Sequence, residues 1–178
     1  IYSLSGPSGS GKSTLLNLLS LIDRPSSGSI KIDNQNINYN EIEINDKIRS
    51  NNIGIVYQEK NLLPDFTAIE NVCIASLAAN NNHKIAEQES LKIIQKVGLK
   101  DRANHYPSEL SGGELQRIAI SRAIVNKPRI ILADEPTGSL DHENANQIFN
   151  LLFKLKNKDR VIILSLIHIS EPTRQFRI

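Results

Sequence analysis

The chain has 178 residues, 39% of them apolar, which fits one folded domain with a hydrophobic core. Lys and Arg number 21 and Asp and Glu 19, so the net charge of +2 argues against a nucleic-acid-binding face, which is usually strongly basic. The single cysteine, Cys73, excludes an internal disulfide, and its apolar surroundings predict a buried, unreactive thiol. No apolar run reaches the roughly 18 residues of a membrane span, and no basic-then-apolar leader is present, so a cytosolic globular domain is expected.

The first third of the chain alternates short apolar runs with turn-forming residues. A helix is predicted over 13–22, with its apolar face made by Leu15, Leu18, Leu19 and Ile22. The asparagine-rich stretch 34–52 is expected to hold loops and a short helix. The other elements predicted in this third are strands at 1–5, 30–32 and 53–57 and turns at 6–11 and 23–28.

From residue 66 to about 126 the apolar pattern becomes helical, and Gly98 has the position of a helix stop. A continuous apolar run at 129–133 predicts a strand buried on both faces, as parallel sheets require. A last strand is expected at 161–164. Asp141 is suited to cap a helix whose apolar stripe contains Ile148, Leu151, Leu152 and Leu155.

Strands that alternate with helices predict an α/β fold with a parallel sheet. The helical middle has the character of an insertion into that fold. The predicted division is therefore a core formed by about 1–64 and 127–163, with a helical subdomain over about 65–126.

The glycine-rich turn fits the phosphate-binding pattern G-x-x-x-x-G-K-[ST]. Glycines let the backbone aim its N–H groups at phosphates, and the following helix points its positive end at them. Lys12 is expected to reach the β- and γ-phosphates and the Ser13 hydroxyl to bind Mg²⁺. A chance match is the alternative, which the strand before and the helix after disfavour. The predicted nucleotide-binding residues are Gly6, Pro7, Ser8, Gly9, Ser10, Gly11, Lys12, Ser13 and Thr14.

The strand at 129–133 is followed by two carboxylates, a Walker B pattern. Asp134 is expected to hold the Mg²⁺ shell, directly or through water, and Glu135 to orient the attacking water. An exposed pair of loop carboxylates is the alternative. It becomes improbable beside a phosphate-binding loop, since ligands of open α/β folds bind at the strand ends.

A third motif, Leu-Ser-Gly-Gly-Glu-Leu-Gln-Arg at 110–117, places Ser111 as the N-cap of a helix that begins with Gly112 and Gly113. Bare glycines at a helix start form a second phosphate-binding end, although an ordinary capped helix would have the same pattern. Gln58 follows the strand at 53–57. Pro136, Thr137 and Gly138 follow the carboxylates, and Ser139, Leu140 and Asp141 come next.

Five motifs in this order resemble the ATP-binding domain of ABC transporters over residues 1–163. The resemblance implies a P-loop NTPase with a RecA-like parallel sheet core and an inserted ABC helical subdomain. It also implies an ATPase that uses ATP and Mg²⁺, with Glu135, Lys12 and Gln58 as catalytic residues and with Ser13, Gln58 and Asp134 around the metal.

The same resemblance implies a homodimer in which two domains meet head to tail across two ATP molecules. Ser111, Gly112 and Gly113 would then act in trans, with Asp141 near the dimer contact. A transmembrane permease is the expected partner, and nucleic acid is not. The permease would contact the segment 61–66, whose apolar residues could equally belong to the core.

Three stretches, 21–28, 65–72 and 133–141, are similar to an exporter-like group. That group includes the lipoprotein-releasing (Lol), macrolide-exporter and cell-division ATPases, and the lipoprotein-releasing type is the best match. Export from the bacterial inner membrane, with the chain peripheral on its cytoplasmic face, is therefore expected. Other hypotheses are a non-transport ABC ATPase, a nucleotide-binding module without turnover, and an inactive fragment.

The sequence departs from the family at both ends, and truncation at both ends is expected. The upstream strands and the aromatic residue that stacks on adenine in the family do not precede Ile1. Leu166 occupies the place of the family's switch histidine. His168 lies two residues late, or roughly 6–7 Å along a strand, so the switch role is not assigned to it.

The segment from Leu164 to Arg174 resembles no ABC sequence but is similar to a translated sequencing-library adapter. Asparagine is abundant up to Asn157 and absent afterwards, which agrees with a change of origin. The hypothesis is that 164–178 is a non-native tail, and a divergent natural tail is the alternative.

Overall fold

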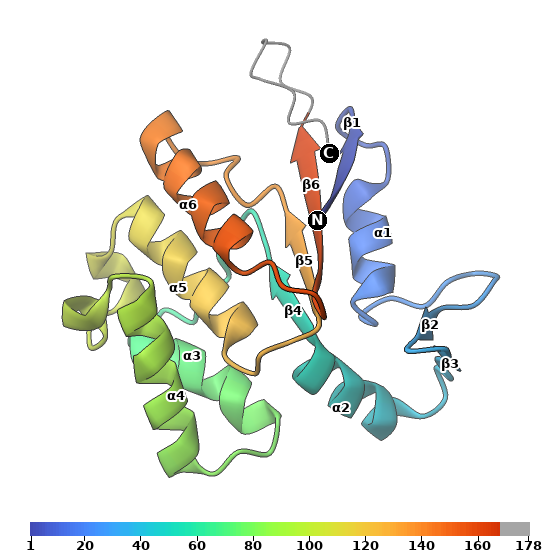
Figure 1. The fold of residues 1–178 in the computed structure, drawn as a ribbon, viewed down its shortest axis with the longest axis horizontal. Helices are drawn as coiled ribbons and strands as arrows, with labels where there is room; N and C mark the ends of the chain where they lie inside the picture. Colours follow the sequence, from blue (N-terminus) through green and yellow to red (C-terminus); the bar gives the residue numbers. More distant parts are fainter. Residues whose placement is uncertain (168–178) are drawn as a thin grey trace.

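The computed structural model describes residues 1–167, and the last strand ends the described part of the chain (Figure 1). Strands and helices alternate, as the sequence predicted. In chain order the elements are β1 (Tyr2–Gly6), α1 (Lys12–Leu19), β2 (Lys31–Ile32), β3 (Gln35–Asn36), α2 (Ile42–Asn52), β4 (Ile53–Val56), α3 (Ala68–Ala78), α4 (His83–Lys96), η1 (Lys100–Arg102), η2 (Pro107–Glu109), α5 (Gly112–Ile124), β5 (Ile130–Asp134), α6 (His142–Lys154) and β6 (Val161–Ile167).

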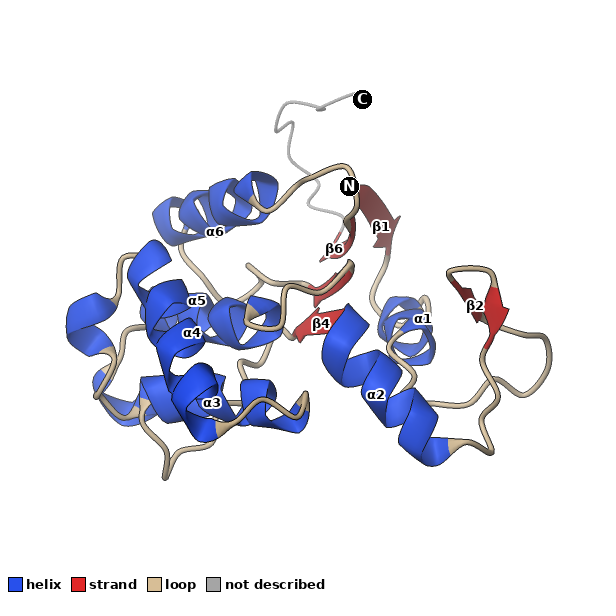
Figure 2. Cartoon of the chain, turned by 60° about the horizontal axis from the view of Figure 1, so that its bottom comes forward, coloured by secondary structure: helices blue, strands red, loops and turns tan. Residues whose placement is uncertain are grey.

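The core is a parallel sheet with strand order β1-β6-β5-β4, and β2 and β3 form a separate antiparallel hairpin. The sheet lies between α1 on one side and α5 and α6 on the other (Figure 2). Successive residues of β5 face opposite layers. Ile131 and Ala133 pack with the helices of the larger core, and Leu132 packs with Leu16 of α1. The predicted parallel sheet, buried on both faces, is confirmed.

The chain between β4 and β5 forms α3, α4 and α5, which lie together on one side of the molecule (Figure 1). The sheet and this helical layer meet closely at Gly54 of β4. A Cβ on Gly54 would collide with the backbone carbonyl of Ala123 in α5. Only glycine therefore allows this approach of strand and helix. The division into a core and a helical subdomain at 65 and 126 stays a prediction.

Side-chain caps fix where several helices begin. Thr67 and Ser111 form capping boxes at α3 and α5, and Asp141 accepts a hydrogen bond from the backbone N–H of Asn144 at the start of α6. Gly98, with φ of 77°, follows the end of α4. The predictions for Ser111, Asp141 and Gly98 as helix boundaries are confirmed.

The predicted apolar face of the first helix is wrong in part. The helix α1 ends at Leu19, because Leu21 has a left-handed backbone with φ of 61°. Leu16 and Leu21 are buried, whereas Leu15 and Ile22 are exposed. The early end of the helix takes Ile22 off its predicted face, whereas within the helix the buried position is Leu16 rather than Leu15.

The apolar neighbours of Cys73 in the sequence predicted a buried thiol. In the structure Cys73, on α3, is only half-buried. Burial still raises the pKa of its thiol, so the thiolate fraction at neutral pH is small. The asparagine-rich stretch holds α2, an 11-residue helix, rather than only a short one.

The last strand is longer than predicted, because β6 continues from Val161 to Ile167. Leu164 pairs with Ala133 of β5 and with Ser3 of β1, so residues 164–167 complete the sheet. The first residues assigned to the non-native tail thus lie in β6. Residues 168–178, His168 included, lie outside the described residues, and the origin of 164–178 stays a prediction.

Within residues 1–167, no helix combines the length and apolar character that crossing a bilayer requires.

Neighbouring residues of α6 provide a test of the core. Leu152 is 1% exposed and Phe153 is 50% exposed. We expect Leu152→Ala to lower the free energy of unfolding by about 2–5 kcal/mol, because it leaves a cavity beneath α6. The control Phe153→Ala should cost less than about 1 kcal/mol. Chemical denaturation of both variants measures the difference, and equal losses would contradict this placement of α6.

Candidate active site

The predicted site residues gather where the parallel strands end. The phosphate-binding loop leaves β1 at Gly6, Asp134 ends β5, and Gln58 follows the end of β4. Since β1, β6, β5 and β4 are mutually parallel, these ends lie on one edge of the sheet. The edge therefore combines a backbone loop with carboxylate and amide side chains.

The loop between β1 and α1 has the conformation that its glycines permit. Gly9 and Gly11 have φ of 79° and 88°, which side chains disfavour. Gly11 is the N-cap of α1, and no side chain caps this helix. The first N–H groups of α1 therefore keep their capacity to bind an anion.

Lys12 joins the loop to the carboxylates. Its Nζ donates hydrogen bonds to the carbonyl oxygens of Gly6 at 2.9 Å and Pro7 at 3.1 Å. The same Nζ lies 3.9 Å from Oε1 of Glu135, and the two side chains are only 9% and 16% exposed. The positive charge of the loop and the predicted water-orienting carboxylate thus occupy one partly enclosed place.

Asp134 and Glu135 differ in their surroundings. The Oδ1 atom of Asp134 is buried without a hydrogen-bond partner among the described residues. A buried carboxylate oxygen of this kind is suited to a cation or to its water shell. Glu135 has φ of 46°, a strained conformation held by its N–H bonding to the Ser165 carbonyl and its carbonyl accepting from the Gly138 N–H.

Gln58 and the residues after Glu135 are neighbours. The amide nitrogen of Gln58 lies 3.0 Å from the place where a Cβ of Gly138 would be. A larger residue at 138 would therefore press on the Gln58 side chain. One loop, after β4, thus touches the loop after β5 at the edge where Asp134 lies.

The signature motif is built into α5 and faces α6. The Ser111 hydroxyl accepts from the Glu114 N–H at 3.3 Å, and Glu114 accepts from the Ser111 N–H at 2.8 Å. This backbone bond and the hydroxyl lower the pKa of Glu114. A Cβ on Gly113 would collide with the side-chain amide of Asn144, whereas one on Gly112 would meet only Leu140 at 3.6 Å.

The predicted residues thus form two groups. The first contains the phosphate-binding loop, Gln58, Asp134 and Glu135. The second contains the signature residues 111–113 and Asp141, whose pKa is lowered by the N–H of Asn144 and its side chain. Among residues 1–167, no hydrogen bond or ion pair joins the signature to the phosphate-binding loop.

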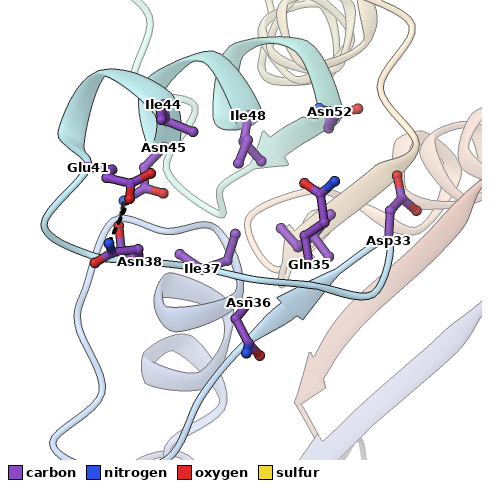
Figure 3. Close-up of a pocket in the computed structure, with 11 residues that line it drawn as sticks. Asp33, Gln35, Asn36, Ile37, Asn38, Glu41, Ile44, Asn45, Ile48 and Asn52 are labelled. Atoms are coloured by element: carbon purple, nitrogen blue, oxygen red, sulfur yellow. Dashed lines mark hydrogen bonds between the residues drawn. The ribbon is translucent and has the colours of Figure 1, made fainter.

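A hollow of about 370 Å³ between α2 and the β2–β3 hairpin is separate from both groups (Figure 3). Asn38 donates a hydrogen bond to Glu41 at its rim, at 2.7 Å. None of the predicted site residues lines it.

Three residues that contact this edge were missed from the sequence. Ser165 supplies the carbonyl that holds Glu135, and its region had been assigned to a non-native tail. Lys60 contacts Ser139, and Arg122 contacts the backbone of the Gln58 loop. The only signal for Arg122 was a charge within the mostly apolar end of α5.

The family of the chain follows from comparison with known proteins. A family model described as "ABC transporter" matches residues 1–138. The lipoprotein-releasing system ATP-binding protein LolD of Rickettsia bellii is 44% identical over 171 residues, which cover 96% of this chain and 75% of that protein. LolD of Legionella pneumophila (strain Lens) is 46% identical over 165 residues, covering 92% and 72%. This chain belongs to the ABC transporter family.

Solved structures agree with this assignment. A dimeric post-hydrolysis state of the ATP-binding cassette MJ0796, bound to ADP and Pi, superposes with a TM-score of 0.83 at 39% identity, covering 95% of this chain and 75% of that one. Another dimeric MJ0796 structure, described as a bacterial ABC transporter cassette, gives 0.84 at 38% identity, covering 93% and 74%. The predicted P-loop α/β fold and the assignment as an ABC ATPase are confirmed.

The two signature glycines provide a matched test of this packing. We expect Gly113→Ala to destabilise the fold by about 1–3 kcal/mol, because its new methyl group overpacks the contact with Asn144. Gly112→Ala should change stability by less than about 0.5 kcal/mol. Thermal and urea unfolding compare the two, and an unaffected Gly113→Ala would contradict the close contact of α5 and α6.

Proposed function

We propose that the chain is the ATP-hydrolysing subunit of a bacterial complex that releases lipoproteins from the inner membrane. Hydrolysis is supported above all by one observation: Lys12 of the phosphate-binding loop and Glu135 lie 3.9 Å apart in a partly enclosed site. The choice of lipoprotein release is supported by relatives named LolD in Rickettsia, Legionella and Bacteroides fragilis, which are 44%, 46% and 45% identical. They favour this group over macrolide-exporter or cell-division ATPases.

The proposed hydrolysis uses the residues in distinct roles. The backbone of 6–14 and the Lys12 ammonium bind the phosphates of ATP, so Lys12 exchanges its carbonyl partners for phosphate oxygens. Glu135 accepts a hydrogen bond from the attacking water and orients it toward the γ-phosphorus. The water oxygen forms a bond to the γ-phosphorus while the bond to the ADP oxygen breaks, and the water protons leave with the inorganic phosphate or pass to solvent, giving ADP and phosphate. Positioning and charge stabilisation supply most of the rate.

The donor set at this edge fits Mg²⁺. The Ser13 hydroxyl, the Gln58 amide oxygen and the Asp134 carboxylate are oxygen ligands, which Mg²⁺ prefers, and the unpartnered Oδ1 of Asp134 is a suitable member. Mg²⁺ bound there would neutralise charge on the phosphates during transfer. Ser13 and Asp134 belong to the ends of different elements, α1 and β5.

The proposal includes a homodimer with two ATP molecules at its interface. Ser111, Gly112 and Gly113 lie in the second group of site residues, apart from the phosphate-binding loop of their own chain, so they would serve the ATP of the other chain. Asp141 packs beside them as the cap of α6. The dimeric form of both MJ0796 structures supports this arrangement.

We place the permease contact on the loop between β4 and α3. Leu63 and Phe66 are 42% and 41% exposed there. The first residue of this loop, Tyr57, also lines a cavity of about 470 Å³, together with residues of α2, α3 and α5 that include Arg49 and Arg122. Exposed apolar side chains on a loop suit contact with a docking helix of a membrane partner. The chain would thereby be held at the cytoplasmic face of the inner membrane.

Glu135 and Lys12 provide the test of hydrolysis. We expect Glu135→Gln to lower ATP turnover by about 100-fold or more while ATP still binds, because water loses its orienting carboxylate. Lys12→Ala should weaken ATP binding about tenfold or more, because it removes a charge-assisted contact to phosphate.

Turnover with Mg²⁺ and binding of a fluorescent ATP analogue measure these effects. The matched control is Glu87→Gln on the exposed side of α4, which should behave as wild type. A wild-type chain without turnover would contradict the proposal and favour the inactive-fragment hypothesis.

The permease contact is tested by placing a negative charge at each of its exposed apolar positions. Leu63→Asp and Phe66→Asp should each weaken co-purification with the permease about tenfold or more, because a desolvated carboxylate disfavours an apolar contact. Ile85→Asp, at a residue 44% exposed on α4, is the control. Release of a triacylated lipoprotein from proteoliposomes should fall in parallel. Unaffected co-purification and release in both variants would contradict this placement of the permease contact. A wild-type complex that hydrolyses ATP without releasing the lipoprotein would instead show that the transported substrate belongs to another class.

A further inference from the structure

The far end of the loop between β4 and α3 is held by the helical layer. Asn71 of α3, only 1% exposed, accepts the N–H of Leu63 at 2.7 Å. Its amide nitrogen donates to the carbonyl oxygens of Leu63, Phe66 and Thr67 at 3.0, 2.9 and 3.0 Å. Residues 63–67 belong to no helix or strand, and the buried Asn71 side chain supplies hydrogen bonds that their backbone would otherwise lack. These bonds couple the position of residues 63–67 to that of α3.

Arg122 of α5 holds the middle of the same loop. Its Nη1 donates to the Asn61 carbonyl at 2.6 Å, and its Nη2 donates to the Lys60 carbonyl at 2.9 Å. Asn61 has a left-handed backbone with φ of 47°, which asparagine tolerates. Two charge-assisted bonds from one planar group fix the orientation of these peptides. They thereby set the direction in which the Lys60 side chain leaves the loop.

Lys60 then reaches the neighbouring loop. Its Nζ donates a hydrogen bond of 2.6 Å to the Ser139 hydroxyl, which belongs to the loop after β5. The adjacent Gly138 N–H bonds to the Glu135 carbonyl at 3.0 Å. A continuous path therefore runs from Arg122 in α5 through Lys60 and Ser139 to the backbone of Glu135.

We propose that Lys60 is a positioning residue for hydrolysis, which, held by Arg122, fixes the loop 136–139 and through it the orientation of Glu135. The inference rests on the proposed role of Glu135. Among residues 1–167, the Lys60 side chain makes no hydrogen bond or ion pair with the phosphate-binding loop or the carboxylates; its hydrogen bond is to Ser139. The contact transmits the position of α5 and of the loop 60–66 to the hydrolytic carboxylate.

The physical requirement is a long side chain with a donor at its end. Lys60→Met keeps the length and removes the donor, whereas Lys60→Arg keeps a donor that can reach Ser139. Ser139→Ala removes the acceptor from the other side. If the bond acts as a unit, the double variant Lys60→Met, Ser139→Ala should be no worse than either single one.

The first measurement is amide hydrogen exchange of the full chain, which is independent of ATP turnover. Lys60→Met and Ser139→Ala should each raise exchange in 136–141 about threefold or more, with no further rise in the double variant, because the loop loses its anchor. Lys60→Arg should exchange as wild type. The matched control is Lys84→Met, at an exposed lysine of α4. Unchanged exchange in Lys60→Met, or additive effects, would overturn the proposal.

The second measurement separates binding from chemistry. Lys60→Met should lower kcat for ATP about threefold to tenfold with KM unchanged, as the loss of one hydrogen bond can do, and Lys60→Arg should restore it. Equal changes in KM, or no rescue by arginine, would contradict a positioning role. If Glu135→Gln retains full turnover, the proposed function fails on that result, whereas the exchange data still decide whether Lys60 anchors the loop.

Discussion

The strand β6 has the decisive place in this fold, because it pairs in parallel with both β1 and β5. The phosphate-binding loop extends from β1 and the two carboxylates end β5. Since β1 and β5 are not paired with each other, the position of one along the strand direction relative to the other depends on the register of β6. Leu4 and Asp134 both pair with Ser165, and this common neighbour brings Lys12 within 3.9 Å of Glu135. A slip of one residue would also turn Ile162 and Leu164 from the face covered by α5 and α6 to the face covered by α1.

Glu135 combines backbone strain with a charged neighbour. Its positive φ would relax in an isolated loop, but hydrogen bonds to Ser165 and Gly138 hold it in place. The Lys12 ammonium shares its hydrogen bonds between two loop carbonyls and faces the Glu135 carboxylate. The arrangement keeps the carboxylate aimed at the place where the loop would hold phosphates. Stabilisation of the sheet and preparation of the site therefore come from the same backbone contacts.

The parts predicted well from the sequence are those encoded by neighbouring residues. Gly98, Ser111 and Asp141 mark helix ends through bonds that span a few positions, and the apolar run before Asp134 predicts its buried strand. The first helix was harder, because the left-handed turn at Leu21 is set by packing rather than by periodicity. The contacts of Lys60 and Arg122 could not be predicted. They join segments 79 and about 60 positions apart, and their hydrogen bonds depend on side-chain direction.

Each end of α5 has one close contact that depends on a glycine. Gly54 lets the strand β4 press on the carbonyl of Ala123, and Gly113 lets Asn144 of α6 approach the signature. The signature and the start of α6 therefore pack closely against each other at Gly113 and Asn144. A surface whose parts are already packed together loses less conformational freedom on binding than separate segments would. A second copy of the chain would meet Ser111 and Asp141 already held at the helix starts. Association would then lose less free energy to the ordering of these residues.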